Sequence, residues 1–221
     1  MITVELHSHT EYSRDCLTSL QSLIDTCRRK GIDRIAITDH NTAAGALKLQ
    51  QMAPDLIIVG EEIMTTEGEL LCFFMQETIP AMLTPAETIK RLRDQGAVIS
   101  VSHPFDRLRK GAWEKSALLK IVEHVDALEV FNSRCLYASD NVSAQQFADE
   151  HGKIGTVGSD AHIPYELGRA TLKMQSFSDR HSFLEVLKTA QPVISLSPFW
   201  VHGMSSIAKW QRKYLGVKLP R

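Results

Sequence analysis

Val4-Glu5-Leu6-His7-Ser8-His9 places two histidines, two positions apart, at the end of a run that alternates like a β-strand. A strand repeats its facing every two residues, so the imidazoles of His7 and His9 are expected to point the same way. Two imidazoles on one side of a strand are suited to coordinating one metal cation. The first nine residues therefore predict a strand that carries metal ligands to one face of a sheet.

Beyond this segment, runs rich in β-branched residues alternate with segments of helical periodicity. Strands are expected at Ile2–Leu6, Arg34–Thr38, Leu56–Val59, Leu70–Phe74, Ala97–Val101, Ala127–Phe131, Ile154–Val157 and Ala170–Met174. Helices are expected at Leu20–Arg29, Pro85–Asp94 and Ser143–Glu150, each with a glycine two residues beyond its end. This order predicts an α/β fold with a mainly parallel sheet. The third and fourth of these strands are also close enough in sequence to form an antiparallel hairpin.

Polar residues follow the expected strands at the points where they end. They are His40, Glu62, His103, Asn132, Asp160 and His162. The carboxyl ends of parallel strands meet on one face of an α/β barrel, where such folds build their active sites. One histidine after a strand is more often structural than a ligand. Ligand-type residues at the ends of several strands instead favour a single multi-metal site.

Length and charge indicate one domain with a separate tail. The chain has 221 residues and a formal net charge of −1, so its overall charge gives no argument for binding nucleic acid or an anionic membrane. We divide it into a main domain at 1–198, which carries the candidate metal ligands, and a basic, aromatic tail at 199–221. The basic residues of the tail are Lys209, Arg212, Lys213, Lys218 and Arg221. An amphipathic helix is expected over Ser205–Leu215, packed on its own barrel or on a second copy, with contact to nucleic acid or a membrane surface as the alternative.

The cysteines and the amino terminus bear on the compartment. Cys16, Cys27, Cys72 and Cys135 show no Cys-x-x-Cys spacing, so we expect reduced, buried thiols. The start of the chain does not read as a secretory signal, and no apolar run approaches the ~20 residues that span a bilayer. A cytoplasmic protein without a transmembrane segment is therefore expected.

Taken in order, the motifs resemble those of the PHP (polymerase and histidinol phosphatase) superfamily of metal-dependent phosphoesterases. They are His7-x-His9, Ser13-x-Asp15, Thr38-Asp39-His40-Asn41, Gly60-Glu61-Glu62-Ile63, Ser102-His103-Pro104, Glu129-Val130-Phe131-Asn132 and Gly158-Ser159-Asp160-Ala161-His162. The resemblance implies a distorted (β/α)7 TIM-like barrel, with divalent ions at the carboxyl face of the sheet and hydrolysis of a phosphate ester.

The resemblance also implies a ligand set. It places His7, His9, Glu62 and Asp160 around one ion, Asp15, His40 and His162 around a second, and His103 on a third that shares Glu62. Members with three complete sites have another histidine after the bridging glutamate, yet residues 63–102 contain none. We therefore expect two ions, with a third site incomplete, and Mn²⁺, Zn²⁺ or Fe²⁺ as the metal.

Two acidic neighbours of the ligands need separate interpretations. Glu61 and Glu62 are adjacent, so only one can face the site from an extended segment, and the family spacing Gly-x-Glu selects Glu62. Glu61 is expected to lie behind the ligands or on the surface. Asp39 is expected to orient a neighbouring imidazole or to cap the next turn without contacting metal.

The expected reaction needs no side-chain nucleophile, because two close cations activate water. Cys16 lacks the Cys-x5-Arg loop of a cysteine phosphatase. Candidates for holding substrate are Arg14, Asn132, Arg134 and Arg169. A basic loop with Arg107, Arg109 and Lys110 is expected to be solvated, with gating of the site or contact with a polyanionic substrate as alternatives. The remaining histidines are treated as structural or surface residues, at positions 124, 151, 181 and 202.

The expected function is hydrolysis of a small phosphate monoester or a nucleotide-like substrate. A 3′-5′ exonuclease acting on oligonucleotides is the enzymatic alternative, because the same metal set serves both reactions. A non-catalytic metal-binding domain is the alternative from another class. The sequence leaves open a nucleic-acid partner and a homo-oligomer.

Overall fold

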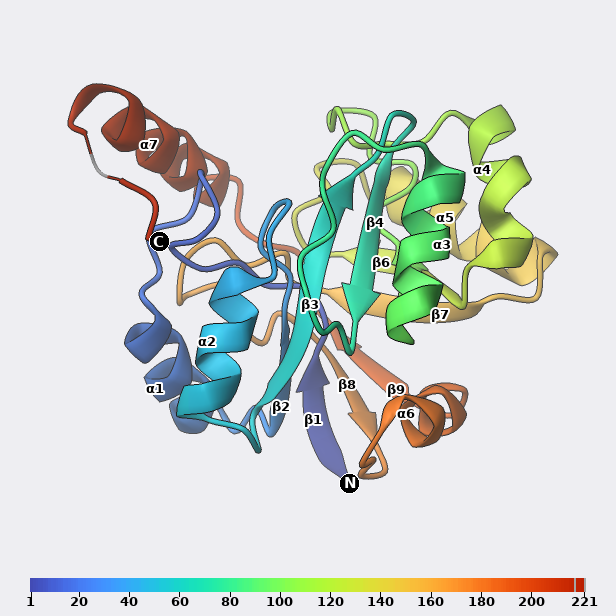
Figure 1. The fold of residues 1–221 in the computed structure, drawn as a ribbon, viewed down its shortest axis with the longest axis horizontal. Coiled ribbons are helices and arrows are strands. Elements are labelled where there is room, and N and C mark those ends of the chain that lie inside the picture. Colours follow the sequence, from blue (N-terminus) through green and yellow to red (C-terminus); the bar gives the residue numbers. More distant parts are fainter. Residues whose placement is uncertain (217, 221) are drawn as a thin grey trace.

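One nine-stranded sheet, curved into a nearly closed barrel, organises the computed structural model, which describes residues 1–216 and 218–220 (Figure 1). The strands are β1 (Ile2–Glu5), β2 (Arg34–Ile37), β3 (Ile57–Met64), β4 (Glu69–Phe73), β5 (Val98–Val101), β6 (Ala127–Asn132), β7 (Ile154–Gly158), β8 (Ala170–Met174) and β9 (Gln191–Ile194). The helices are α1 (Leu20–Lys30), α2 (Ala44–Met52), α3 (Pro85–Gln95), α4 (Lys115–Ile121) with the 3-10 turn η1 (Val122–His124), α5 (Ala138–Glu150), α6 (Arg180–Leu187) and α7 (Val201–Tyr214).

The strand order is β7-β6-β5-β4-β3-β2-β1-β8-β9. Two parallel blocks, β1–β2–β3 and β5–β6–β7, are joined by β4, which pairs antiparallel with both of its neighbours. The β3–β4 hairpin considered from the sequence is therefore present. The α/β barrel expected from the sequence is confirmed. The strands β4, β8 and β9 interrupt the parallel order, and the expected number of seven βα units stays a prediction.

The two ends of the sheet approach each other beside the first histidine motif. Ser8 bridges Ala161 in parallel fashion, and the amide of His9 donates to the carbonyl of Ala161 at 2.9 Å. A Cβ at Gly158 would lie 2.3 Å from the Cβ of His7, so only glycine allows this approach. The closure brings the segment that follows β7 against the segment that follows β1.

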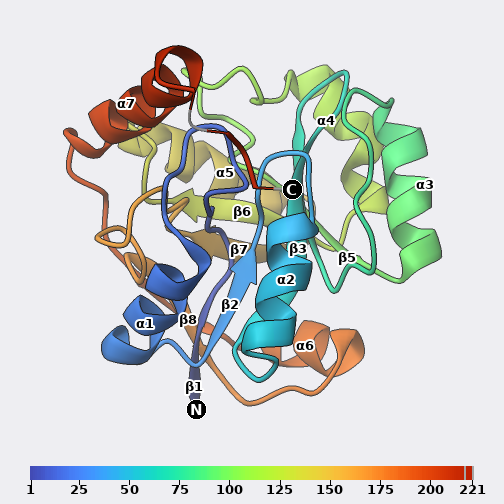
Figure 2. The ribbon, with the colours of Figure 1, turned by 60° about the vertical axis from the view of Figure 1, so that its left-hand side comes forward.

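Local signals explain the helix ends. In α1 the hydroxyl of Ser19 accepts from the amide of Ser22, and Gly31 ends the helix in the left-handed region at φ 65°. In α3 the hydroxyl of Thr84 accepts from the amide of Glu87. Figure 2 shows α1, α2 and α3 around the outside of the sheet, and α7 toward the end to which the β2 arrow points.

Three differences from the sequence-based expectation concern element bounds. β3 runs on to Met64, because Gly60–Met64 pairs with β4, so Glu62 lies inside a strand and not after one. α5 begins at Ala138, five residues before the expected start. α7 covers Val201–Tyr214 where Ser205–Leu215 was expected. The division into 1–198 and 199–221 stays a prediction, and Arg221 lies outside the described residues.

The cysteines are all free and buried, as expected. Burial raises the pKa of both Cys16 and Cys27 to about 12, so neither is a thiolate at neutral pH. A nucleophilic role for Cys16 is therefore disfavoured by its surroundings. Among the described residues, no helix combines the length and the apolar character needed to cross a membrane.

Candidate metal centre

The eight side chains that the sequence singled out as ligands lie together at the carboxyl end of the parallel strands. They are His7, His9, Asp15, His40, Glu62, His103, Asp160 and His162, and all but the partly exposed His40 are buried. They come from the segments after β1, β2, β5 and β7, from the loop that precedes α1, and from β3 itself. The fold thus brings together residues that are up to 155 positions apart in the chain.

The innermost group is built around His9. Its Nε2 atom lies 3.2 Å from His7 Nε2 and 3.2 Å from Asp160 Oδ1. Glu62 completes this group, with Oε1 3.4 Å from His7 Nε2 and Oε2 3.5 Å from His9 Nε2. Two imidazole nitrogens and two carboxylates therefore converge on one small volume, and their role as ligands of one ion stays a prediction.

A second group lies nearer the surface. Asp15 Oδ1 is 3.5 Å from His40 Nε2 and 3.4 Å from His162 Nε2. The donor atoms of His9, His40 and His162 also lie within 4.8 Å of one another, so His9 stands between both groups. Glu62 Oε2 lies 2.9 Å from His40 Nδ1, which makes this carboxylate the common neighbour of the two groups.

Several buried atoms of the centre suit a cation. Asp15 Oδ1, Glu62 Oε2 and His162 Nε2 make no hydrogen bond with any described residue, although each is shielded from solvent. Buried polar atoms are normally hydrogen-bonded, so exceptions that converge on one volume need a partner. Imidazole nitrogens and carboxylate oxygens are the donors that Mn²⁺, Fe²⁺ and Zn²⁺ accept. The residues present therefore fit divalent metal ions.

The charges of the centre are strongly coupled. Burial acts to raise the pKa of Glu62, but His7 and His40 outweigh it and hold this pKa well below its usual value. Burial acts to lower the pKa of His7, yet the carboxylates around it raise that pKa well above its usual value. In contrast, burial and the imidazoles of His162 and His40 lower the pKa of His9 well below its usual value. Because ligands bind metal in their deprotonated forms, ion binding must release protons from this centre.

Glu129 is a supporting residue to which the sequence assigned no role. Its Oε1 atom lies 2.8 Å from His7 Nδ1, which leaves Nε2 of that ring aimed at the centre. Its Oε2 atom accepts from the amide of His103 at 2.9 Å and from the side-chain amide of Asn132 at 3.1 Å. One acid inside an otherwise apolar strand, Ala127–Phe131, is the signal that could have identified it.

Asp39 also acts from behind the ligands. It accepts hydrogen bonds from the amide and the hydroxyl of Thr10, at 2.7 and 2.6 Å, and from the hydroxyl of Ser13 at 2.6 Å. The same hydroxyl lies 3.2 Å from His9 Nδ1. Asp39 therefore positions the imidazole of His9 through Ser13, in keeping with the orienting role expected for it.

The four candidate substrate-binding residues lie in different surroundings. Arg14 is exposed and lines a pocket beside the centre. Asn132 is buried and donates to Glu129, and Arg134 is buried with its guanidinium 3.1 Å from Glu166 and 2.7 Å from His162 Nδ1. Arg169 bonds the hydroxyl of Tyr165 and the carbonyl of Leu196, away from that pocket. Only Arg14 of the four lines the pocket, and the substrate-binding roles of all four stay predictions.

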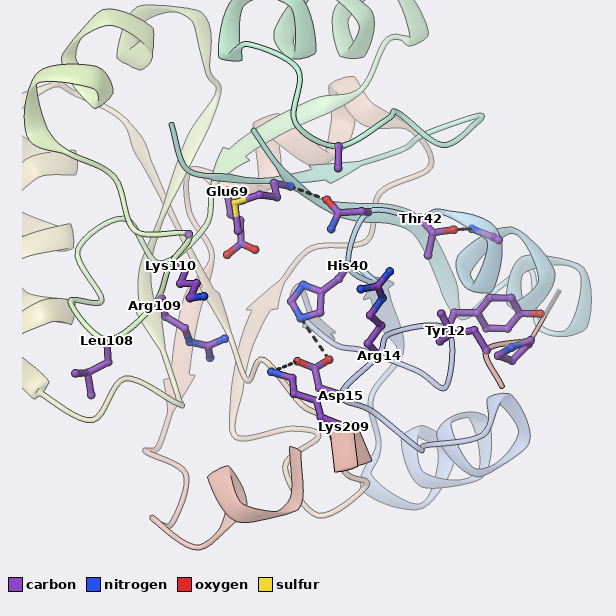
Figure 3. Close-up of a pocket in the computed structure, with 17 residues that line it drawn as sticks. Tyr12, Arg14, Asp15, His40, Thr42, Glu69, Leu108, Arg109, Lys110 and Lys209 are labelled. Atoms are coloured by element: carbon purple, nitrogen blue, oxygen red, sulfur yellow. Dashed lines mark hydrogen bonds and ion pairs between the residues drawn. The ribbon is translucent and has the colours of Figure 1, made fainter. Parts of the chain in front are cut away.

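The pocket has a volume of about 820 Å³, and two of the ligand candidates, Asp15 and His40, line it (Figure 3). Asp15, His40 and Glu69 line its inner side, and its cationic side chains are Arg14, Arg109, Lys110 and Lys209. Lys209 reaches in from α7, where its Nζ lies 3.1 Å from Asp15 Oδ2. Arg109 forms an ion pair with Asp160. Of the histidines outside the motifs, none of those at positions 124, 151, 181 and 202 lines this pocket in the described part of the chain.

Glu69 is the second residue that sequence reasoning missed. It is buried at the start of β4, and its Oε2 atom lies 3.6 Å from His103 Nε2. The donor atoms of His40, Glu62 and Glu69 lie within 4.8 Å of one another. Its position could have been found only with the register of the β3–β4 hairpin, which the sequence left open.

Comparisons with known proteins concern the sequence and the fold. The sequence matches the PHP domain over residues 5–132 and the PHP-associated region over residues 138–192. An uncharacterised protein of Methanocaldococcus jannaschii is 36% identical over 178 residues, which cover 79% of this chain and 71% of that protein.

Two solved structures share the fold. One is a two-domain protein of Bacteroides vulgatus that contains a predicted PHP-like metal-dependent phosphoesterase, with a TM-score of 0.70 and 18% identity. The match covers 88% of this chain and 65% of that longer one. The other is PsfC of Pseudomonas syringae, with a TM-score of 0.67 and 16% identity over 97% of this chain and 98% of that one.

Proposed function

This chain belongs to the PHP domain family, and from that premise we propose that it is a metal-dependent phosphoesterase that hydrolyses a small phosphate monoester or a nucleotide-like compound. We propose as metal ligands the eight residues His7, His9, Asp15, His40, Glu62, His103, Asp160 and His162. Two divalent ions are the basic complement, and the number and identity of the ions are part of the proposal.

The observation that carries the proposal is the pairing of the metal centre with a cationic pocket. Metal-ligand candidates Asp15 and His40 line the same pocket as four basic side chains, which come from the loop before α1, from the loop after β5 and from α7. Cations around a metal centre suit an anionic group held against it, and phosphate is the anion that such sites most often take. Divalent ions, when bound, lower the pKa of coordinated water and neutralise charge on phosphoryl oxygens.

The chain's own side chains supply binding and orientation. Arg14 and Lys110 make no side-chain hydrogen bond or ion pair within the described residues, so their charges are free to meet a ligand. Lys209 pairs with Asp15 and can exchange that partner for a phosphate oxygen. Arg109 holds Asp160, and its position beside the centre suits contact with the same phosphate.

The size of the pocket favours a small substrate. Its volume of about 820 Å³ falls within the range of roughly 300–1,000 Å³ for small-ligand pockets. Lys209 of α7 and the segment at Leu219 and Pro220 form part of its wall. Arg212, another basic residue of the tail, is already hydrogen-bonded to the carbonyls of Glu11 and Cys16. These contacts favour a bounded pocket over a groove that continues along the tail, so the exonuclease is the second candidate.

The test is hydrolysis by chelator-stripped protein reloaded with Mn²⁺, Zn²⁺ or Fe²⁺. Phosphate release from nucleoside and sugar monophosphates is compared with the shortening of single-stranded oligonucleotides. We expect metal-dependent release from monophosphates, abolished by His7→Ala. Shortening of oligonucleotides without release from monophosphates would replace the proposal by the exonuclease.

A matched pair of lysine variants tests the pocket itself. Lys209→Ala should raise KM for the phosphate substrate, whereas Lys213→Ala, on the same helix but outside the pocket, should leave KM unchanged. Tight metal binding with no turnover on any of these substrates would support the non-catalytic domain.

A further inference from the structure

Glu69 stands on the same face of the sheet as Glu62. In the β3–β4 hairpin Glu62 lies opposite Leu71 and Met64 lies opposite Glu69, so strand alternation directs the two glutamate side chains to one side. On the other side of β4, the carbonyl of Glu69 accepts from the amide of Ser102, the residue before His103. Three neighbouring strands therefore deliver Glu62, Glu69 and His103 to one place.

The distances show that these three side chains form one group. His103 Nε2 lies 3.1 Å from Glu62 Oε1 and 3.6 Å from Glu69 Oε2. The donor atoms of Glu62 and Glu69 lie within 4.8 Å of each other, together with one from His40. An imidazole nitrogen thus faces two carboxylates at the inner end of the pocket.

The Glu69 carboxylate and one oxygen of Glu62 lack hydrogen-bond donors among the described residues, although imidazoles lie near both side chains. Glu69 is 7% exposed, and its carboxylate makes no hydrogen bond with any described residue. Glu62 Oε2 is buried and makes none either. Arg109 is the nearby cation, but its ion pairs are with Asp160 and Asp106. Two like charges buried side by side are costly unless a cation lies between them.

The loop after β5 is shaped around the Glu69 carboxylate. The amide of Glu69 donates to the carbonyl of Gly111 at 2.9 Å, and Trp113 Nε1 donates to the Glu69 carbonyl at 2.9 Å. A Cβ at position 111 would lie 1.9 Å from Glu69 Oε2, so the loop leaves room for this side chain only because Gly111 has none. The loop therefore holds the backbone of Glu69 in place and leaves room for its carboxylate.

We propose that Glu69 is a ligand of a further divalent ion, held together with His103 and the shared carboxylate of Glu62. The sequence analysis expected the third site to be incomplete, because residues 63–102 contain no histidine. The carboxylate of Glu69 would supply the missing ligand. Two carboxylates and one imidazole form an oxygen-rich set, which suits Mn²⁺ better than Zn²⁺. The inference shares the metal centre with the proposed function but concerns ion binding, so a failure to hydrolyse phosphate esters leaves it standing.

The experiment compares Glu69→Gln with Glu67→Gln, a matched change at an exposed glutamate in the turn of the same hairpin. Chelator-stripped full-length protein is dialysed against free Mn²⁺, and bound Mn²⁺ per chain is measured by atomic emission and by electron paramagnetic resonance. Wild type and Glu67→Gln should bind one more Mn²⁺ per chain than Glu69→Gln. The loss of affinity at that site should exceed the roughly 10–100-fold that removal of an outer-shell partner costs.

Equal Mn²⁺ content and affinity in Glu69→Gln and wild type would overturn the inference. If Glu69→Gln does not fold, Gly111→Ala gives a second measurement, because the added methyl group must displace the Glu69 carboxylate without removing it. That variant should also lose the weakest-bound Mn²⁺, and full retention of three ions by it would contradict the assignment. Ion-free Glu69→Gln should be at least as stable as ion-free wild type, which a purely structural role for this carboxylate would not give.

Discussion

The inner and outer faces of strand β3 each bury a glutamate, and the two are adjacent in sequence. Glu62 faces the candidate metal centre, where His7, His9, His40 and His103 surround it, and its pKa is held well below the usual value. Glu61 faces the other way, where burial raises its pKa to about 8 and the amide of Ile79 is its hydrogen-bond donor. The residue type and the strand are the same, so the charge of each carboxyl group is decided by its neighbours.

The largest expected difference between the two faces is in activity. Glu62→Gln removes the charge shared by both ligand groups and should lower kcat/KM by roughly 10²–10³-fold, the range for losing one preorganised electrostatic group. Glu61→Gln, the matched change one residue away, should leave kcat/KM nearly unchanged. Initial rates of phosphate release from the Mn²⁺-loaded variants would measure both. A greater loss in Glu61→Gln than in Glu62→Gln would reverse the assignment of the two faces.

The next effect is on stability. Metal binding should stabilise a variant altered on the outer face of β3 but hardly stabilise one altered on the inner face. An ion that binds only the folded state adds about 2.7 kcal/mol per site to the free energy of unfolding at 100 times its Kd. Thermal unfolding with and without a chelator should therefore show a rise in Tm with Mn²⁺ for wild type and Glu61→Gln. Glu62→Gln should show a much smaller rise. If chelation leaves the Tm of wild type unchanged, the centre does not bind ions in the folded state.

Removing a residue that orients a candidate ligand should lower metal affinity less than removing the ligand itself. Ser13 Oγ donates to Asp39 and lies 3.2 Å from His9 Nδ1, so Ser13→Ala leaves this imidazole without its orienting partner. We expect Mn²⁺ affinity to fall by roughly 10-fold, the lower part of the usual range for such partners, because Thr10 still holds Asp39. Calorimetric titration would measure it, with Ser206→Ala on exposed α7 as the control. An unchanged Kd would show that His9 is positioned by packing alone.

The sequence predicted the ligand candidates that stand in local motifs better than the residues whose contacts depend on strand pairing. Short sequence motifs identify four of the histidines without any knowledge of strand pairing, and the structure brings these residues together. They are His7, His9, His103 and His162. The sequence did not identify Glu69 and Glu129, because their contacts depend on the register of strand pairing. Glu69 meets His103 through the β3–β4–β5 pairing, and Glu129 meets His7 across 122 positions of chain.

Element bounds show the same division between local and long-range information. α1 and α3 begin at the hydroxyl caps Ser19 and Thr84 and end at Gly31 and Gly96, all readable from sequence. β3 exceeds its expected length because β4 pairs with Gly60–Met64, which is tertiary information. β9 was not expected at all, since its exposed residues carry no burial pattern.

The remaining expected effect concerns Glu61 and the pH dependence of stability. Its pKa in the folded protein, about 8, lies above the usual 4.5, so the folded state holds a proton that the unfolded state releases. The free energy of unfolding is therefore unaffected by Glu61 below about pH 4.5 and falls as the pH rises toward 8, by at most about 1.4 kcal/mol per pH unit. Glu61→Gln removes this loss and keeps an acceptor for the amide of Ile79.

Urea unfolding of wild type and Glu61→Gln, in chelator at pH 5, 6, 7 and 8, isolates this contribution. The histidines of the centre and Glu5, whose pKa burial raises to about 7, titrate in both proteins and cancel in the difference. The stability advantage of Glu61→Gln should grow with each step of pH. An advantage that stays constant across the series would mean that Glu61 is ionised when folded, and the outer face of β3 would then need a cation as the inner face does.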